Sequence, residues 1–459
     1  MSRTLSRDFE TRRDAWLATA PSFGGRLTGH LGDDTATLAG HLSRQEDLLA
    51  ELPAKPERDA AQRRSADTLL GAGRTARLCF LTRHAEAVYD LLTDGRTRRP
   101  RLSELVYTAA VRFPGLVPTR ARMAVEESRI QAHKDGLEID QGLFCGAVLH
   151  SPTAGRHLID TMALPTPRAL ELLDGFRATG RVELASVLLE RRGPAAYVEF
   201  RNAQHLNAED NRLIGDLETA VDLALLDDRV RVGVLRGGEV DHPRYRGRRV
   251  FSAGINLKAL RNGEISFIDF LLGRELGYIS KMLRGLLPEP TEVTWPDPRR
   301  QKPWIGAVDT FAIGGGMQLL LVLDRVLLES GAFLSLPAAE EGIVPGLGNL
   351  RLRRLTGARM ARQIILGGRR ITGDDPEVRL LCDEVVPAAL MDAAIEASVA
   401  ELAAPAVVAN RRMLGLSEEP VDLYREYLAE FAVIQATRTH SEDVLAKMER
   451  RWRRTLSRR

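Results

Sequence analysis

Cysteine, aromatic residues and net charge are all scarce in this sequence of 459 residues. The three cysteines, Cys79, Cys145 and Cys382, are far apart and odd in number, which argues against a disulfide framework and fits a reducing compartment. A net charge of +3 gives no large field that would favour DNA or RNA as a partner. No apolar run approaches the roughly 18–20 residues that a membrane span needs, and the N-terminus is charged rather than apolar. These absences predict a cytoplasmic protein that binds neither nucleic acid nor membrane.

The signatures of common cofactor sites are also missing. The sequence has no G-x-x-x-x-G-K-[ST] loop and no flavin or nicotinamide fingerprint. Its one H-x-E match, His84-Ala85-Glu86, lies in a helical stretch, where residues two apart do not face one way. The other histidines are scattered, so an iron site of two histidines and one carboxylate is not indicated. We therefore expect neither a metal nor a cofactor.

A basic run at the C-terminus is the one feature that suits a polyanion, although such a run is also typical of a solvated helix end. It consists of Arg450, Arg451, Arg453, Arg454, Arg458 and Arg459.

The texture of the chain changes near residue 175. Residues 1–175 have apolar positions at helical spacing, with glycine and proline at the joins, and predict an all-helical N-terminal domain. Residues 151–167 carry three prolines and predict a connector. From residue 176 to 385, short strand-like runs such as 230–236 alternate with helical stretches, which predicts an α/β core. Residues 386–459 are again helical, which gives three predicted domains.

Two glycine-containing segments carry the chemistry. Residues 251–257 read Phe-Ser-Ala-Gly-Ile-Asn-Leu, and residues 311–319 read Phe-Ala-Ile-Gly-Gly-Gly-Met-Gln-Leu. Each is predicted to be a turn that leads into a helix, where glycine lets the backbone approach a ligand and unpaired N–H groups favour negative charge. Three glycines alone would equally serve close packing of a strand against a helix. The pair of turns, about sixty residues apart with a strand between them, is far more specific.

Together with their neighbours, these turns resemble the crotonase (enoyl-CoA hydratase/isomerase) superfamily over roughly residues 182–450. The further matching motifs are Leu206-Asn207-Ala208, Gly237-Gly238, Gly342-Ile343-Val344-Pro345-Gly346 and Ser441-Glu442-Asp443. The resemblance implies a crotonase-like superhelix of stacked ββα units, with C-terminal helices that support a homo-oligomer, a trimer or a dimer of trimers. It also implies an acyl-CoA substrate whose enolate oxygen is bound by the backbone N–H groups of Ile255 and Gly315. Such donors, aimed at developing negative charge, lower the barrier to removal of the α-proton.

The sequence departs from a hydratase at both acid positions. A hydratase needs two carboxylates to position and split water. In the family one acid follows the three glycines by two residues, and the other lies eight residues before the proline of the G-x-x-P-G motif. Those positions are Gln318 and Ala338 here, and the nearby Glu340 and Glu341 are shifted by two and three residues. Simple hydration is therefore not expected.

The two missing acids, the helical extension and the long insert between Asn262 and Lys302 resemble one subgroup of the superfamily. It contains the cofactor-independent dioxygenases that act on 3,5-dihydroxyphenylacetyl-CoA in the biosynthesis of vancomycin-type glycopeptide antibiotics. The resemblance implies that the enolate reduces O2 and that the resulting peroxide attacks the thioester, which releases CoA and 3,5-dihydroxyphenylglyoxylate. Another crotonase-type isomerase, hydrolase or lyase, or a non-catalytic acyl-CoA-binding scaffold, remains an alternative.

Four side chains near these motifs suit that chemistry. Gln318 can hydrogen-bond a substrate without protonating its carbanion. Ile343, beside Val344, can line a small dry pocket for O2, although it could also be an ordinary core residue. Glu209 can accept a hydrogen bond from a phenol, or it can simply be a charge at a helix N-terminus.

Arginines and flanking glycines complete the predicted site. Arg274 resembles the arginine of the subgroup that reaches the aromatic ring, although a surface arginine is the alternative. Arg246, Arg248 and Arg249 are placed to meet the CoA phosphates, or they are surface charge. Gly254 and Gly316 adjoin the two donors and are expected to contact the thioester through their backbone.

Overall fold

The computed structural model describes residues 5–21, 27–290 and 295–456, and the side chains as far as residue 450. Arg458 and Arg459 of the basic run therefore lie outside the described residues. The chain forms two compact units, each built from separate segments. The first, here called the helical unit, comprises Met1–Leu158, Arg261–Ile268 and Arg425–Leu445. The second, the sheet unit, comprises Ile159–Leu260, Asp269–Tyr424 and Ala446–Arg459.

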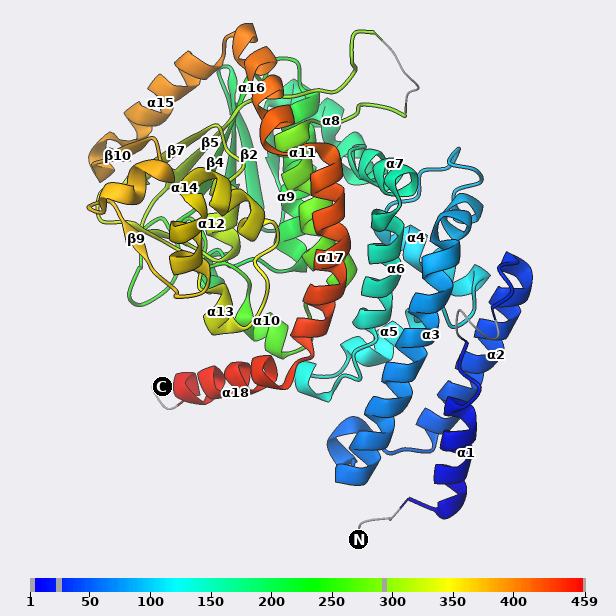
Figure 1. Cartoon of the computed structure of the whole chain (residues 1–459). Coiled ribbons are helices and arrows are strands. Elements are labelled where there is room, and N and C mark those ends of the chain that lie inside the picture. The colour runs from blue at the N-terminus through cyan, green and yellow to red at the C-terminus, as the bar shows by residue number, and fades with distance from the viewer. Residues whose placement is uncertain (1–4, 22–26, 291–294, 457–459) are drawn as a thin grey trace. The chain divides into compact units, whose positions relative to one another are not determined.

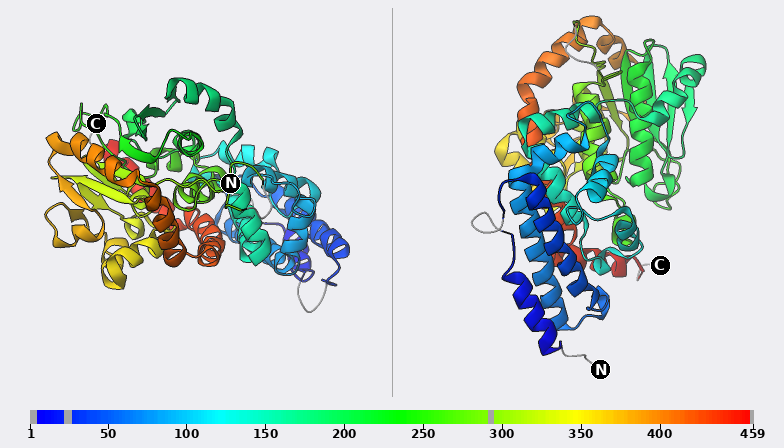
Figure 2. Two further views of the ribbon diagram at one scale, coloured as in Figure 1. Left: turned by 90° about the horizontal axis from the view of Figure 1, so that it is seen from above. Right: turned by 90° about the vertical axis from the view of Figure 1, so that its right-hand side faces the viewer.

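The helical unit confirms the helical N-terminal region that the sequence predicts (Figures 1 and 2). Its helices are α1 (Arg7–Leu17), α2 (Leu31–Ala50), α3 (Ala60–Leu92), α4 (Leu102–Arg112), α5 (Arg120–Glu127), α6 (Glu138–His150), most of α7 (Pro152–Met162) and most of α17 (Val421–Thr439). The long helix α3 begins at a capping box, in which the side chain of Asp59 accepts hydrogen bonds from the N–H groups of Ala61 and Gln62. Among the described residues no helix is both long and apolar enough to cross a membrane.

Helices α6 and α17 approach each other through glycine. A Cβ atom on Gly142 would lie 2.7 Å from the carbonyl oxygen of Ala432, and one on Gly146 would lie 2.8 Å from that of Ala429. Real Cβ atoms do not come this close to backbone oxygen, so any larger residue would force the two helices apart. The four-residue spacing places both glycines on one face of α6.

The connector expected at residues 151–167 is wrong, because Pro152–Met162 forms α7. Pro152 stands at the first helical position, where no intrahelical N–H bond is required and the fixed φ of proline suits the helix. The proline therefore starts the helix instead of breaking it.

The sheet unit has the α/β architecture that the sequence predicts, with a seven-stranded and a three-stranded sheet (Figure 1). The larger sheet has the order β1 (Arg181–Glu183), β2 (Val187–Arg192), β3 (Ala195–Phe200), β4 (Val232–Gly237), β5 (Trp304–Val308), β7 (Arg325–Glu329) and β10 (Glu384–Val386). The first three strands pair antiparallel and the others parallel. The smaller sheet has the order β6 (Phe311–Ile313), β8 (Phe333–Ser335) and β9 (Ile371–Thr372).

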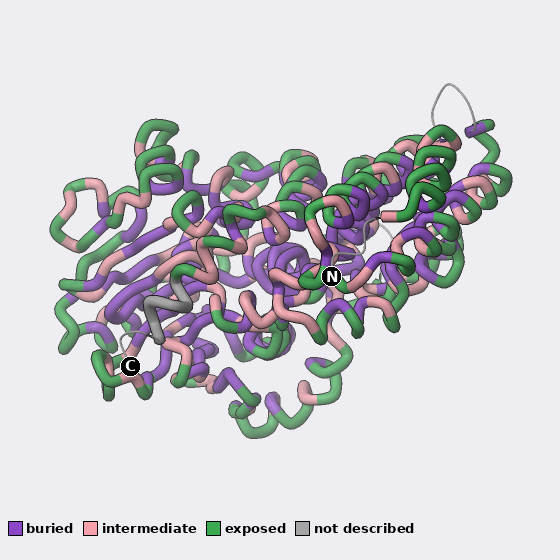
Figure 3. The backbone as a smooth tube through the Cα atoms, turned by 90° about the horizontal axis from the view of Figure 1, so that it is seen from below, coloured by how far each residue is buried: buried purple, intermediate pink, exposed green. Residues whose placement is uncertain are grey.

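Helices cover the larger sheet and bury its centre. Helix α9 (Asn211–Leu226) packs on β2 and β3, and α15 (Met391–Leu402) packs on β4, β5 and β7. Alternate residues of β5, Ile305 and Ala307, join Ile395 of α15 in one apolar cluster, as the two-residue period of a strand requires. The whole of β5 is buried, and Figure 3 shows the sheet strands largely in the colour of buried residues.

The remaining helices of the sheet unit alternate with its strands or follow the last of them. They are α8 (Pro167–Thr179), α10 (Leu257–Arg261), α11 (Ser280–Arg284), α12 (Gly315–Leu320), α13 (Ala338–Glu341), α14 (Gly348–Ile365), α16 (Pro405–Glu418) and α18 (Glu442–Leu456). Two π-helical turns, Phe267–Leu272 and Glu275–Ile279, precede α11 within the predicted insert.

Candidate active site

The two glycine turns lie side by side, as the sequence predicts. Ser252 forms a parallel bridge with Ala312, and the N–H of Ile313 donates to the carbonyl oxygen of Ser252 at 2.9 Å. Gly254 has a φ of +80°, and a Cβ on it would lie 2.8 Å from the oxygen of Ile313 and 3.2 Å from the nitrogen of Gly315. Only glycine allows both the backbone conformation and this close approach.

The predicted oxyanion donors, Ile255 and Gly315, both have unpaired N–H groups. Within the part of the chain that the structure describes, neither N–H donates a hydrogen bond. The neighbouring backbone groups of the turn are paired. The backbone N–H of Glu209 donates to the carbonyl oxygen of Gly254 at 2.7 Å, and the backbone N–H of Asn256 donates to the carbonyl oxygen of Glu209 at 2.8 Å. Both donor residues are partly exposed. Two accessible and unpaired amides on adjoining turns are what a site for an oxyanion requires.

A buried ion pair adjoins the glycine cluster. Arg274 donates to both carboxylate oxygens of Glu209 at 3.0 Å, and its Nη2 also donates to the carbonyl oxygen of Gly315 at 2.7 Å. A Cβ on Gly315 would lie 2.0 Å from Oε2 of Glu209. Arg274 is 4% exposed, so the alternative reading as a surface arginine is wrong. Burial alone would lower the pKa of Arg274, but the charge of Glu209 raises it above its usual value.

The ion pair extends into a chain of buried charges that the sequence reasoning missed. Arg274 donates to Glu275 at 3.0 Å, Arg351 contacts Glu275 at 3.3 Å, and Arg351 donates to Glu419 at 3.0 and 3.1 Å. Burial would raise the pKa of Glu419, but Arg351 and Arg284 lower it to about 2. No motif marks these residues, which come from three separate helical segments, so only their burial reveals them.

Gln318 projects from α12 into the same cluster, where its Oε1 accepts a hydrogen bond from Arg274 at 3.3 Å. Ala338, at the other acid position of a hydratase, is a buried residue at the start of α13. Glu340 is exposed, and its carboxylate lies against Gly368, where a Cβ would be 2.4 Å from its Oε1. Glu340 therefore does not replace the missing acid.

The G-x-x-P-G turn closes on Gln318. A Cβ on Gly346 would lie 2.7 Å from Oε1 of Gln318 and 2.2 Å from Oε1 of Glu275, and its φ of +45° also favours glycine. Ile343 and Val344 precede it and are both partly exposed. The turn that carries these two apolar side chains thus adjoins the side chain of Gln318.

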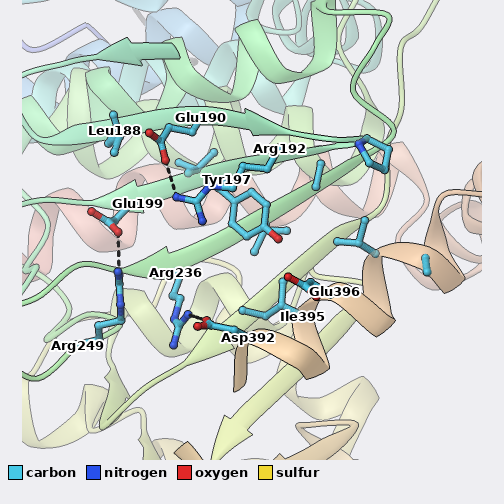
Figure 4. A pocket seen from close by; sticks show the side chains of 16 residues that line it. Leu188, Glu190, Arg192, Tyr197, Glu199, Arg236, Arg249, Asp392, Ile395 and Glu396 are labelled. Carbon is cyan, nitrogen blue, oxygen red and sulfur yellow. Dashed lines mark hydrogen bonds and ion pairs between the residues drawn. The ribbon is translucent and has the colours of Figure 1, made fainter. Parts of the chain in front are cut away.

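The three arginines predicted to meet CoA do not act together. Arg246 and Arg248 are exposed and approach Asp241 at 3.7 Å and Glu329 at 3.3 Å. Arg249 instead donates to Glu199 at 2.8 Å and lines a groove of about 620 Å³ over β2, β3, β4 and α15 (Figure 4).

The groove does not include the glycine cluster. Tyr197, Ile395 and Val399 supply apolar surface, and Arg236 pairs there with Asp392 (Figure 4). Sequence reasoning did not predict this groove, since its residues come from strands and a helix far apart in the chain.

The H-x-E residues of α3 have separate partners. His84 is buried and hydrogen-bonds to Asp34 at 2.8 Å, whereas Glu86 pairs with Arg96 at 2.7 Å. Over residues 5–21, 27–290 and 295–456, no three metal-ligating side chains are grouped so that they could hold an ion.

Paired glycine turns that present two free amides inside an α/β unit are typical of enzymes that stabilise the enolate or oxyanion of an acyl thioester. The sequence pattern of the enoyl-CoA hydratase/isomerase family matches residues 298–418. A curated relative from Amycolatopsis orientalis, named (3,5-dihydroxyphenyl)acetyl-CoA 1,2-dioxygenase, is 56% identical over 91% of this chain and 95% of its own. The chain belongs to the enoyl-CoA hydratase/isomerase, or crotonase, family, and to the branch that contains this relative.

Two further comparisons cover between 51% and 59% of the chain. A probable enoyl-CoA hydratase from Rhizobium meliloti is 28% identical over 51% of this chain and 82% of its own. A solved enoyl-CoA hydratase/isomerase from Pseudoalteromonas atlantica is 19% identical, covers 59% of this chain and 97% of its own, and has a TM-score of 0.48.

Proposed function

We propose that this chain is a dioxygenase that converts 3,5-dihydroxyphenylacetyl-CoA and O2 into 3,5-dihydroxyphenylglyoxylate and CoA. One observation carries the proposal beyond the likeness to the dioxygenase relative. The two unpaired amides of Ile255 and Gly315 adjoin the cluster that contains Gln318, and glutamine and alanine stand at the two sequence positions where a hydratase has its acids. An enolate held there meets no carboxylic acid at those positions that would return a proton to its α-carbon.

The reaction follows from that environment. Removal of the α-proton puts negative charge on the thioester oxygen, and each of the two amides lowers this barrier by about 2.7–4 kcal/mol. The electron-rich α-carbon then reduces O2 and forms a carbon–oxygen bond to give a peroxide. The terminal peroxide oxygen attacks the thioester carbonyl, and CoA leaves as a thiolate. The second α-proton is then removed, and its C–H electron pair forms the ketone as the O–O bond breaks. Both atoms of O2 end in the glyoxylate, which balances the reaction.

The roles of individual residues are part of this proposal. Ile255 and Gly315 bind the enolate oxygen, with Gly254 and Gly316 beside the thioester, and Gln318 provides a polar contact that holds no proton to return. Ile343 and Val344 line the path of O2, which is apolar and small. Glu209 accepts a hydrogen bond from the dihydroxyphenyl ring, and Arg274 borders the ring while it holds the Glu209 carboxylate. The exposed Arg246 and Arg248 meet the CoA phosphates.

We further propose that no metal or organic cofactor takes part. The enolate supplies the electrons that O2 needs, so the chemistry requires no separate reductant.

Self-association and location complete the proposal. Helix α16 exposes three large apolar side chains, Met413, Leu414 and Leu416, each more than half exposed, which supports a homo-oligomer. A trimer or a dimer of trimers is the assembly that the family resemblance implies. The three cysteines are free thiols, which suits the cytoplasm. The domain limits 1–175, 176–385 and 386–459 stay predictions.

Oxygen consumption tests the function directly. Protein treated with a chelator should consume one O2 for each CoA released from 3,5-dihydroxyphenylacetyl-CoA, and isotopically labelled O2 should place both labelled atoms in the product. Exchange of the α-proton without oxygen uptake would instead indicate an isomerase, hydrolase or lyase of the same family. Tight binding of the thioester without any exchange would indicate a scaffold.

A further inference from the structure

Glu275 is a buried carboxylate at the point where three parts of the candidate site meet. It is 1% exposed, and its Oε1 accepts a hydrogen bond from Nη1 of Arg274 at 3.0 Å. Its Oε2 contacts Nη1 of Arg351 at 3.3 Å. A Cβ on Gly346 would lie 2.2 Å from Oε1 of Glu275, so the same carboxylate touches the G-x-x-P-G turn.

Arg274 uses its full hydrogen-bonding capacity within the chain. A guanidinium has five N–H donors in a fixed plane. Nε and Nη2 serve Glu209 and the carbonyl oxygen of Gly315, whereas Nη1 serves Glu275 and Gln318. The orientation of the guanidinium therefore depends on Glu275 on one edge as much as on Glu209 on the other.

Glu275 is itself held from outside the glycine cluster. The hydroxyl of Tyr424 donates to its backbone carbonyl at 2.8 Å, and Arg351 is fixed in turn by two hydrogen bonds to Glu419. The three carboxylates of Glu209, Glu275 and Glu419 pair with four arginines, Arg274, Arg284, Arg351 and Arg354. Loss of one carboxylate would leave a buried cation without its counter-charge, which is strongly unfavourable.

We propose that Glu275 is a positioning residue that holds Arg274 against the carbonyl of Gly315 and also fixes the Gly346 turn against Gln318. The proposal rests on the function proposed above. Glu275 thereby holds the Gly315 turn, which binds the enolate oxygen, at a fixed position relative to the turn that carries Ile343 and Val344. Loss of the Glu275 carboxylate should therefore change whether the α-carbon of the enolate reacts with O2 or takes up a proton. It should affect the formation of the enolate less.

The substitution Glu275→Gln tests this, because glutamine keeps the size and removes the charge. The readout is the ratio of oxygenated product to α-proton exchange, measured in one reaction mixture with deuterated solvent. We expect this ratio to fall by about tenfold to a hundredfold, the scale of a small misplacement of reacting groups, while exchange persists. The variant Arg351→Lys, which keeps a cation but loses the two-pronged bond to Glu419, should shift the ratio in the same direction. It serves as the test if Glu275→Gln does not fold.

Asp222→Asn is the matched control. Asp222 is another fully buried carboxylate, paired with Lys281 at 2.7 Å and with the backbone N–H of Thr166, and it has no contact with the glycine cluster. Its neutralisation should lower stability and leave the ratio unchanged.

The outcomes separate the two proposals. An unchanged ratio in a folded Glu275→Gln variant, or in Arg351→Lys if that variant alone folds, overturns the positioning role. An equal change in Asp222→Asn also overturns it. Wild-type protein that exchanges the α-proton without consuming O2 overturns the proposed function instead.

Discussion

Nη2 of Arg274 donates a hydrogen bond of 2.7 Å to the carbonyl oxygen of Gly315. The residue that we propose as an oxyanion donor through its N–H is thus held by a side chain at its carbonyl end. This bond fixes the orientation of the Gly315–Gly316 peptide, which is the first peptide of α12. A preorganised donor of this kind needs no rearrangement as charge develops on the substrate.

Replacement of Gly315 by alanine should abolish most of the activity. The new Cβ would lie 2.0 Å from the carboxylate of Glu209, so either the ion pair or the donor turn must move. We expect kcat to fall by about a hundredfold or more, as for loss of an oxyanion donor. Gly215→Ala is the control, because Gly215 is exposed on α9 with nothing within 4 Å of its Cβ position. That variant should be fully active, and a fully active Gly315→Ala would rule out the donor role.

Gln318→Glu should favour return of the proton over oxygenation. A carboxyl group at this position restores an acid like that of a hydratase beside the α-carbon. We expect more deuterium in recovered substrate for each O2 consumed, measured by mass spectrometry and an oxygen electrode. An unchanged partition would mean that Gln318 lies away from the α-carbon.

Ile343→Ala should change the dependence on oxygen more than the binding of thioester. The truncation widens the apolar surface of the turn without touching the two amide donors. We expect the KM for O2 to change while the affinity for a non-reactive substrate analogue stays the same. Equal changes in both constants would remove Ile343 from the oxygen path.

Arg246→Gln combined with Arg248→Gln should weaken binding of the CoA thioester. Both side chains are exposed, so loss of their charges should cost little stability. The matching pantetheine thioester has no nucleotide phosphates and should bind the variant and the wild type equally well. A loss of affinity for both thioesters would show that these arginines do not read the phosphates.

Glu419 should make stability depend on acid pH. Its pKa is about 2 in the folded chain against an ordinary value of 4.5, so the contribution is present above pH 4.5 and is lost as the pH falls from 4.5 toward 2. The full difference corresponds to roughly 3 kcal/mol. Urea unfolding at a series of pH values should show a steeper acid loss of stability in wild type than in Glu419→Gln. Parallel curves would contradict the assignment.

The sequence predicts the pairing of the two glycine turns well, because the residues that form each turn are neighbours in the chain. Glycine at positions 254 and 314 marks backbone conformations that other residues avoid, and the flanking apolar runs mark the strands that bring the two turns together. The helical texture of the N-terminal region is equally local. Pro152 misled the prediction at α7, because a proline can begin a helix as well as end one.

The chain of buried charges could not be predicted in the same way. Glu275, Arg351 and Glu419 lie in separate parts of the sequence, within or at the end of helical segments. From the sequence alone, a charged residue in such a segment is expected to be exposed. Only the three-dimensional packing turns these positions inward and pairs them. Arg249 shows the opposite error, since the sequence suggested a role in binding CoA and the structure pairs it with a side chain of the protein. It is next to Arg248 in the sequence, but its guanidinium donates to Glu199.

The helical unit is assembled from three segments, Met1–Leu158, Arg261–Ile268 and Arg425–Leu445. During synthesis, the glycine face of α6 must therefore wait for nearly the entire polypeptide to leave the ribosome before α17 arrives to cover it. Cleavage of the mature chain near residue 175 would separate the early helices from their late partner in sequence without producing a complete helical unit. Any attempt to transplant this unit onto another protein would have to carry all three of its segments.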